Sequence, residues 1–121
     1  MTAIALDHIQ IAMPQGGETA ARRFFGQLLA MTEIAKPDAL AGRGGLWFVL
    51  DDGIGFHLGV EADFRPANKA HAGLRLATFE TVLARLEQAE VAVERGLDTF
   101  GRRRAYLNDP FGNRLELIDG A

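Results

Sequence analysis

The chain has 121 residues, of which 48% are hydrophobic, and it carries a formal net charge of −3. This length is enough for one compact domain with a substantial core, and the weakly acidic balance argues against a nucleic-acid partner. The lack of cysteine excludes disulfide bonds and thiolate metal sites. Because no leader peptide or membrane-spanning apolar run is present, the sequence predicts a cytoplasmic protein with no membrane partner.

The first half of the chain predicts a strand, a helix and three further strands. Apolar side chains alternate along the strands, whereas Phe24, Phe25 and Leu28 recur at helical spacing. Asp51–Gly53 has the composition of a hairpin turn. The predicted elements are strands at 4–13, 32–35, 46–50 and 54–60, a helix at 18–30, and a glycine-rich loop at 36–45.

The same order of elements returns after a polar linker at 61–69. Strands are expected at 70–77, 91–93, 103–107 and 113–119, a helix after a Thr78 N-cap, and a charged loop at 94–102. Residues 46–60 align without a gap with residues 105–119. The chain is therefore predicted to be one domain, 1–121, with α+β fold. Two βαβββ modules, 4–60 and 70–119, would form an eight-stranded mixed sheet curled around a cavity, with the helices outside.

Four side chains that can bind a metal fall at related positions of the two modules. They are His8, His57, His71 and Glu116, each on the strand face opposite the strongly apolar residues. A carboxylate within a strand is costly to bury without a cation, and three imidazoles and a carboxylate suit Zn²⁺, Ni²⁺, Mn²⁺ or Fe²⁺. A pseudo-twofold arrangement of the modules would collect these four groups. Gly55 and Gly59, beside His57, predict a close approach by a ligand.

The remaining polar residues of these faces leave two interpretations open. Arg104 and Tyr106 can join Arg102 in an anion clamp, or the arginines can form a solvated loop face. Arg75 and Arg114 can contact substrate, or they can neutralise Glu116 in a structural pair without catalysis. The predicted substrate-binding residues are Gln10, Trp47, Arg75, Arg104 and Arg114, and the predicted proton donor is Tyr106.

Two motifs resemble the vicinal oxygen chelate superfamily, which includes glyoxalase I, fosfomycin-resistance thiol transferases, extradiol dioxygenases and bleomycin-binding proteins. These motifs are Leu6–Ile9 and Asp109–Glu116. The resemblance implies that His8, His57, His71 and Glu116 ligate a divalent metal, and that the protein forms a homodimer. His57 stands where glyoxalase I commonly has a glutamate, so a triad without His57 is also consistent with related chemistries.

Two classes of function compete on this sequence. In the first, the protein is a metal-dependent lyase, isomerase, thiol transferase or dioxygenase whose metal chelates vicinal oxygens of a small-molecule substrate, with Glu116 and Tyr106 as catalytic residues. In the second, it is a metal-free protein that binds a small molecule such as an antibiotic. A structural dimer with a vestigial site is a third possibility. The three histidines and Glu116 at ligand positions favour the first class.

Overall fold

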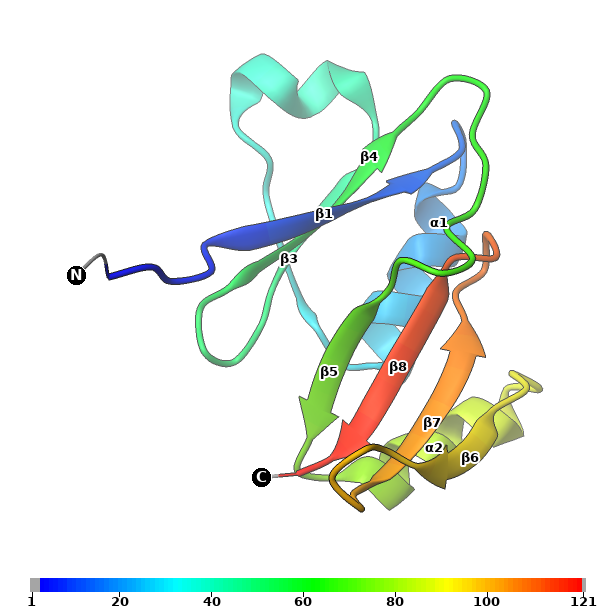
Figure 1. Ribbon diagram of the computed structural model, residues 1–121. Coiled ribbons are helices and arrows are strands. Elements are labelled where there is room, and N and C mark those ends of the chain that lie inside the picture. The colour runs from blue at the N-terminus through cyan, green and yellow to red at the C-terminus, as the bar shows by residue number, and fades with distance from the viewer. Residues whose placement is uncertain (1–2, 121) are drawn as a thin grey trace. The chain divides into compact units, whose positions relative to one another are not determined.

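Each half of the chain folds into a strand, a helical segment and three further strands, as the computed structural model of residues 3–120 shows (Figure 1). The boundary lies between Arg65 and Pro66, which divides the chain into unit 1 and unit 2. The predicted α+β fold with two βαβββ modules is confirmed. Its eight strands form two four-stranded mixed sheets, one in each unit.

Unit 1 has the strand order β1-β4-β3-β2, in which β1 and β4 are parallel and the other neighbours are antiparallel. Its elements are β1 (His8–Met13), α1 (Glu18–Ala21), η1 (Arg22–Leu28), β2 (Thr32–Ile34), η2 (Asp38–Arg43), β3 (Leu46–Val49) and β4 (Gly55–Val60). The helical segment continues from α1 into η1 with wide turns, because the Leu29 N–H donates to the carbonyl of Phe24, five residues earlier.

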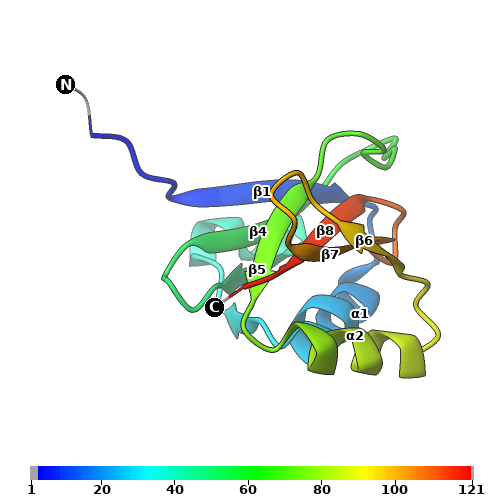
Figure 2. The same cartoon turned by 60° about the horizontal axis from the view of Figure 1, so that its bottom comes forward.

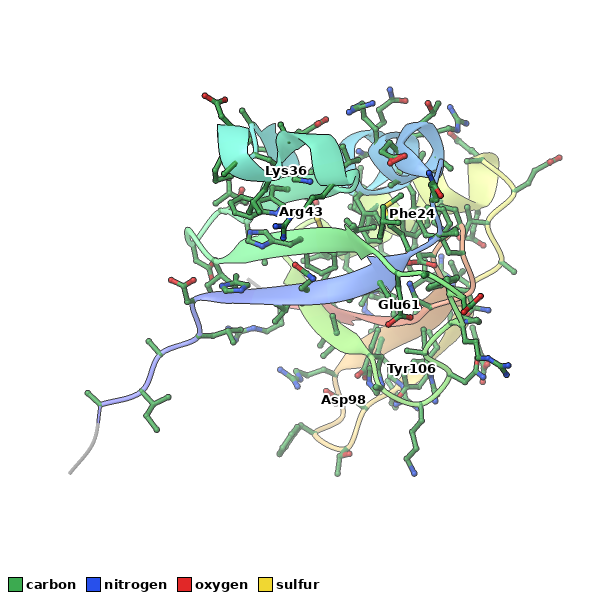
Figure 3. All side chains as sticks on the ribbon, turned by 90° about the horizontal axis from the view of Figure 1, so that it is seen from above. Phe24, Lys36, Arg43, Glu61, Asp98 and Tyr106 are labelled. Atoms are coloured by element: carbon green, nitrogen blue, oxygen red, sulfur yellow. The ribbon has the colours of Figure 1, made fainter. Side chains whose placement is uncertain are left out.

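Aromatic residues form the core of unit 1. Phe25, Phe48 and Phe56 are fully buried, and the ring centroids of Phe25 and Phe56 lie 5.3 Å apart. Phe24 packs edge-on against Phe25 on the same helical segment (Figure 3). The apolar residues of the predicted helix therefore face the sheet, and the opposite faces of the strands carry other side chains.

Unit 2 repeats this topology with the order β5-β8-β7-β6, again with its first pair parallel. Its elements are β5 (Ala72–Leu76), α2 (Phe79–Gln88), β6 (Glu94–Leu97), β7 (Arg103–Asn108) and β8 (Arg114–Asp119). Helix α2 lies along one face of this sheet (Figures 1 and 2) and buries its predicted stripe of Phe79, Val82, Leu83 and Leu86. Leu115 and Leu117 of β8 are buried, whereas the other face of β8 carries the polar side chains.

The turn before β8 explains the second sequence motif in structural terms. The buried Asp109 carboxylate accepts hydrogen bonds from the Phe111 N–H, the Asn113 N–H and the Asn113 Nδ2, each at 2.9 Å. The Asn113 Oδ1 accepts in turn from the N–H of Ala67 at 3.0 Å. Burial raises the pKa of Asp109, although these hydrogen bonds oppose the rise. The motif thus fixes the start of β8 and the linker beside it.

Some predicted boundaries are wrong for identifiable reasons. The strand expected at 91–93 is formed instead by Glu94–Leu97, an edge strand whose four residues are all exposed, so alternation does not reveal it. The first strand begins at His8 because pairing with β4 begins there. Part of the loop at 36–45 forms η2, which begins two residues after Lys36 and ends at Arg43, both labelled in Figure 3. Thr78 occupies the N-cap position, but its side chain makes no capping hydrogen bond.

Candidate functional site

Three rings stack on the polar face of unit 1. The Trp47 and His57 rings stack nearly parallel, with a 2° interplanar angle and centroids 4.0 Å apart. His8 stacks with His57 at 4.8 Å. The register explains the first contact, because Trp47 on β3 is directly opposite His57 on β4. Burial lowers the pKa of His57 and the imidazole of His8 lowers it further, whereas Asp7 opposes the shift, so the net effect disfavours the protonated ring.

The glycines beside His57 make room for the chain's own side chains. A Cβ added at Gly55 would meet the Nε2 of His57 at 2.8 Å, and one added at Gly59 would meet the Nε2 of Gln10 at 2.6 Å. The space above β4, which the sequence suggested for a ligand, is therefore occupied by His57 and Gln10. Gln10 lies on the predicted face, and its side chain packs over Gly59 of the neighbouring strand.

His8 carries an acidic neighbour that orients its ring. The Nδ1 of His8 lies 2.7 Å from the Oδ2 of Asp7, and both side chains are solvent-exposed. Because a carboxylate accepts hydrogen bonds, Nδ1 carries the proton and the neutral ring presents its Nε2 lone pair. A carboxylate that holds the far nitrogen of a histidine is a common arrangement around protein metal ligands.

In unit 2, His71 faces Glu116 directly. The Nε2 of His71 lies 3.2 Å from the Oε1 of Glu116, and the Nδ1 lies 2.8 Å from the carbonyl oxygen of Lys69. A carbonyl oxygen can only accept, so Nδ1 carries a proton in either charge state of the ring. Glu116 is well buried, with 14% of its side chain exposed. The pair lies at the β5–β8 junction, where β8 contributes Glu116 and His71 immediately precedes β5.

Tyr106 lies at the centre of the cluster around Glu116. Tyr106, which is labelled in Figure 3, lies on β7 directly opposite Glu116 of β8. The Tyr106 and His71 rings meet in a T-shaped contact with a centroid separation of 5.7 Å. The guanidinium carbons of Arg104 and Arg114 lie over the Tyr106 ring at 4.2 and 4.0 Å. Arg104 also donates a 2.8 Å hydrogen bond to the Tyr106 hydroxyl.

The arginine near the carboxylate differs from the two that the sequence suggested. Arg104 Nη1 lies 3.7 Å from the Oε2 of Glu116, whereas neither Arg75 nor Arg114 forms an ion pair within the described part of unit 2. Arg75 is exposed and packs near Gly120. Arg102 does not join the cluster, because Asp98 holds its Nε at 2.7 Å.

A pocket opens beside Tyr106 on unit 2, with a volume of about 390 Å³. Its polar lining comprises Asn68, Glu94, Tyr106, Asn108 and Arg114. This volume lies within the roughly 300–1,000 Å³ usual for small-molecule pockets. Tyr106 thus has the His71–Glu116 pair on one side and this pocket on another.

The predicted metal ligands therefore occur as two close pairs, His8 with His57 and His71 with Glu116. Within the described residues of either unit taken alone, no group of three His, Asp or Glu side chains can hold one ion. No described helix is long and apolar enough to cross a membrane.

Comparisons with known proteins place this geometry in a family. Residues 5–117 match the Glyoxalase/Bleomycin resistance protein/Dioxygenase superfamily. The chain belongs to this superfamily. A glyoxalase-family protein from Bacillus anthracis is 35% identical, with a TM-score of 0.92 and coverage of 100% of this chain and 98% of that one. Among curated proteins, none matches.

More distant solved structures share the superfamily fold. A glyoxalase/dioxygenase from Nostoc punctiforme is 20% identical at a TM-score of 0.77, covering 100% of this chain and 98% of that one. A lactoylglutathione lyase from Agrobacterium tumefaciens is 17% identical at a TM-score of 0.75, with coverage of 98% and 96%. At these identities the likeness concerns the fold alone.

Sequence reasoning missed the groups that orient the candidate ligands. Asp7 precedes His8 directly, and this adjacency was a visible signal in the sequence. The carbonyl of Lys69 left no such signal, because every residue has a backbone carbonyl and the sequence does not show which one His71 contacts. Asn68 and Asn108 line the pocket from a linker and from the end of β7, which no periodic pattern brings together.

Proposed function

We propose that this protein is a metal-dependent enzyme of the superfamily that acts on a small-molecule substrate. His8, His71 and Glu116 would ligate one divalent ion, Zn²⁺, Ni²⁺, Mn²⁺ or Fe²⁺, with His57 as a fourth ligand. When bound, such an ion acts as a Lewis acid that chelates adjacent substrate oxygens and stabilises developing negative charge.

The observation that carries this proposal is the contact between His71 and Glu116. The Lys69 carbonyl fixes the proton on the Nδ1 of His71, so a neutral His71 directs a lone pair at a carboxylate oxygen 3.2 Å away. Two acceptors at this distance repel unless a cation lies between them. A proton can serve this purpose, and so can a metal ion.

The distance between the donor atoms of His71 and Glu116 suits a bound metal ion. Zn²⁺ binds nitrogen and oxygen ligands at about 2.0–2.2 Å, so two ligands at a right or tetrahedral angle are about 2.9–3.4 Å apart. The 3.2 Å between the Nε2 of His71 and the Oε1 of Glu116 falls in this range. His8 adds an imidazole whose far nitrogen is already held by Asp7.

His57 differs from the other two imidazoles in its surroundings. It is buried between Trp47 and His8, and burial lowers its pKa, which favours the neutral form that a metal requires. The same stack also lets His57 serve as a wall behind His8. A His57→Gln variant separates these roles, since a wall can be replaced with little loss of metal affinity and a ligand cannot.

The chain's own residues would bind substrate and move protons around the ion. The Tyr106 hydroxyl accepts a hydrogen bond from Arg104, which leaves its own O–H available for a substrate oxygen. Glu116 is the carboxylate of this cluster that would accept a proton from the substrate. Gln10, Trp47 and Arg75 are the further substrate-contacting residues of this proposal.

Calorimetric titration of chelator-treated, tag-free protein with each of the four ions tests the proposal. We expect one ion per chain with sub-millimolar affinity, and at least a tenfold loss in both the His71→Ala and the Glu116→Ala variants. Glu61→Ala, an exposed residue of unit 1, is the matched control and should leave the affinity unchanged. Binding weaker than about millimolar for all four ions, roughly −4 kcal/mol, would reject a metal enzyme.

A metal-free binding protein is the second candidate, and Arg104 is the observation in its favour. Its guanidinium already lies 3.7 Å from the Glu116 carboxylate, which reduces the need for a metal cation. In that case, ligand would bind unchanged after chelation and His71→Ala would matter little. We further propose a homodimer for either function, and light scattering that gives only a 13.1 kDa species at micromolar concentration would contradict it.

A further inference from the structure

The pocket beside Tyr106 is lined by an arginine, Arg114, that forms no ion pair with any residue the structure describes. In unit 2, Arg95, Arg102, Arg103 and Arg104 each have a carboxylate within 4 Å. None of the described ion pairs of this unit includes Arg114. Arg114 is half-buried and lines the pocket of about 390 Å³. A half-buried guanidinium of this kind is a ready partner for an anionic ligand.

Arg114 is held in place by an aromatic ring and not by a charge. Its guanidinium carbon lies 4.0 Å from the centre of the Tyr106 ring. This cation–π contact restrains the side chain while leaving its N–H donors available to an incoming acceptor. Asn68 and Asn108 line the same pocket and add amide donors next to this charge.

We propose that this pocket binds an anionic group, a carboxylate or a phosphate, of the substrate, with Arg114 as its specificity-determining residue. The inference rests on the proposed function, because Tyr106 joins the two regions. Its ring lies under Arg114 and meets His71 edge-on at 5.7 Å. The substrate class is therefore a small acid whose anionic group binds at Arg114 while other oxygens reach the region of the His71–Glu116 pair.

Glu94 adds a negative charge to the lining of the same pocket. Glu94 is exposed and lies opposite Tyr106 on β6. It repels an anion, so its removal should tighten anion binding. A ligand that carried an ammonium group beside its carboxylate would show the opposite effect, since Glu94 would then attract it.

The test is an NMR titration of the metal-free protein, following the arginine Nε–H signals as inorganic phosphate, acetate or glycine is added. We expect saturable shifts of the Arg114 signal with phosphate or acetate, and the tighter of these two probes identifies the anion. Arg114→Met should raise the dissociation constant at least tenfold, and Arg114→Lys less than Arg114→Met. Glu94→Gln should lower it about twofold. Arg23→Met, which removes an exposed charge in unit 1, is the control.

Three results would overturn the proposal. The first is an unchanged dissociation constant in an Arg114→Met variant whose far-UV circular dichroism is native. The second is an equal loss of anion affinity in the Arg23→Met control. The third is tighter binding of glycine than of acetate, together with weaker glycine binding in Glu94→Gln. Because the titration contains no metal, a failure of metal binding leaves its result intact. Glu116→Gln should bind the anion at least as tightly as the parent, since the substitution removes a neighbouring negative charge.

Discussion

Replacing Glu116 by glutamine separates the stability of the site from its metal affinity. The amide can donate a hydrogen bond to the Nε2 of His71, which now faces a carboxylate oxygen at 3.2 Å. Such a bond contributes about 0.5–1.5 kcal/mol. The substitution also removes the attraction of Arg104, 3.7 Å away across partly exposed side chains, which is worth about 0.2–1 kcal/mol. The two effects nearly cancel, so the metal-free variant should unfold within about 1 kcal/mol of the parent.

The same variant should lose its affinity for the ion. A neutral amide replaces the anionic ligand, and we expect Zn²⁺ to bind at least about 100-fold more weakly, a loss of about 2.7 kcal/mol. Urea denaturation at pH 8 in the presence of chelator, followed by circular dichroism, gives the free energy of unfolding. Calorimetry of the chelator-free protein gives the metal affinity.

Two outcomes would refute this reasoning. If Glu116→Gln binds Zn²⁺ within about threefold of the parent, a difference of about 0.7 kcal/mol, the carboxylate is not a ligand. If the metal-free variant loses more than about 2 kcal/mol, His71 and Glu116 form a true ion pair, and no lone pair of His71 faces the carboxylate. Glu61→Gln on an exposed site controls for the loss of one negative charge.

Three further predictions follow from particular contacts. Asp7→Asn weakens the hydrogen bond that orients His8 and should reduce the metal affinity measured by calorimetry about 10–100-fold. Asp109→Ala leaves buried donors unpaired and should lower the free energy of unfolding by at least about 2 kcal/mol. Burial raises the pKa of Asp109 in the folded state. Protonation of Asp109 therefore stabilises the fold at acidic pH, and this contribution is lost as the pH rises through the pKa of the folded state. The gap between parent and Asp109→Ala in urea denaturation should therefore widen as pH falls. Gly45→Ala places a methyl group at a φ of 84° against the carbonyl of Leu58 and should destabilise the protein by at least about 1 kcal/mol, whereas Gly42→Ala, with open space, should not.

The repeated order of elements, together with the gapless alignment of residues 46–60 with residues 105–119, predicted the common topology of the two halves. Strands β3 and β4 span Leu46–Val49 and Gly55–Val60, and β7 and β8 occupy the aligned positions. This worked because periodic apolar residues decide which face of a strand is buried, and that information is local. The edge strand β6 was not predicted at its true position, because all four of its residues are exposed and its position is set by pairing with β7.

The sequence by itself determined the fold class, the repeat and the four candidate metal ligands, because residue type and spacing carry that information. Only the tertiary structure decided which groups meet. It placed Trp47 on His57, filled the space above Gly55 with a side chain, and brought Arg104 rather than Arg75 near Glu116. It also fixed the proton on the Nδ1 of His71 through the Lys69 carbonyl. These contacts depend on register and rotamer between strands distant in the chain, and no local pattern encodes either one.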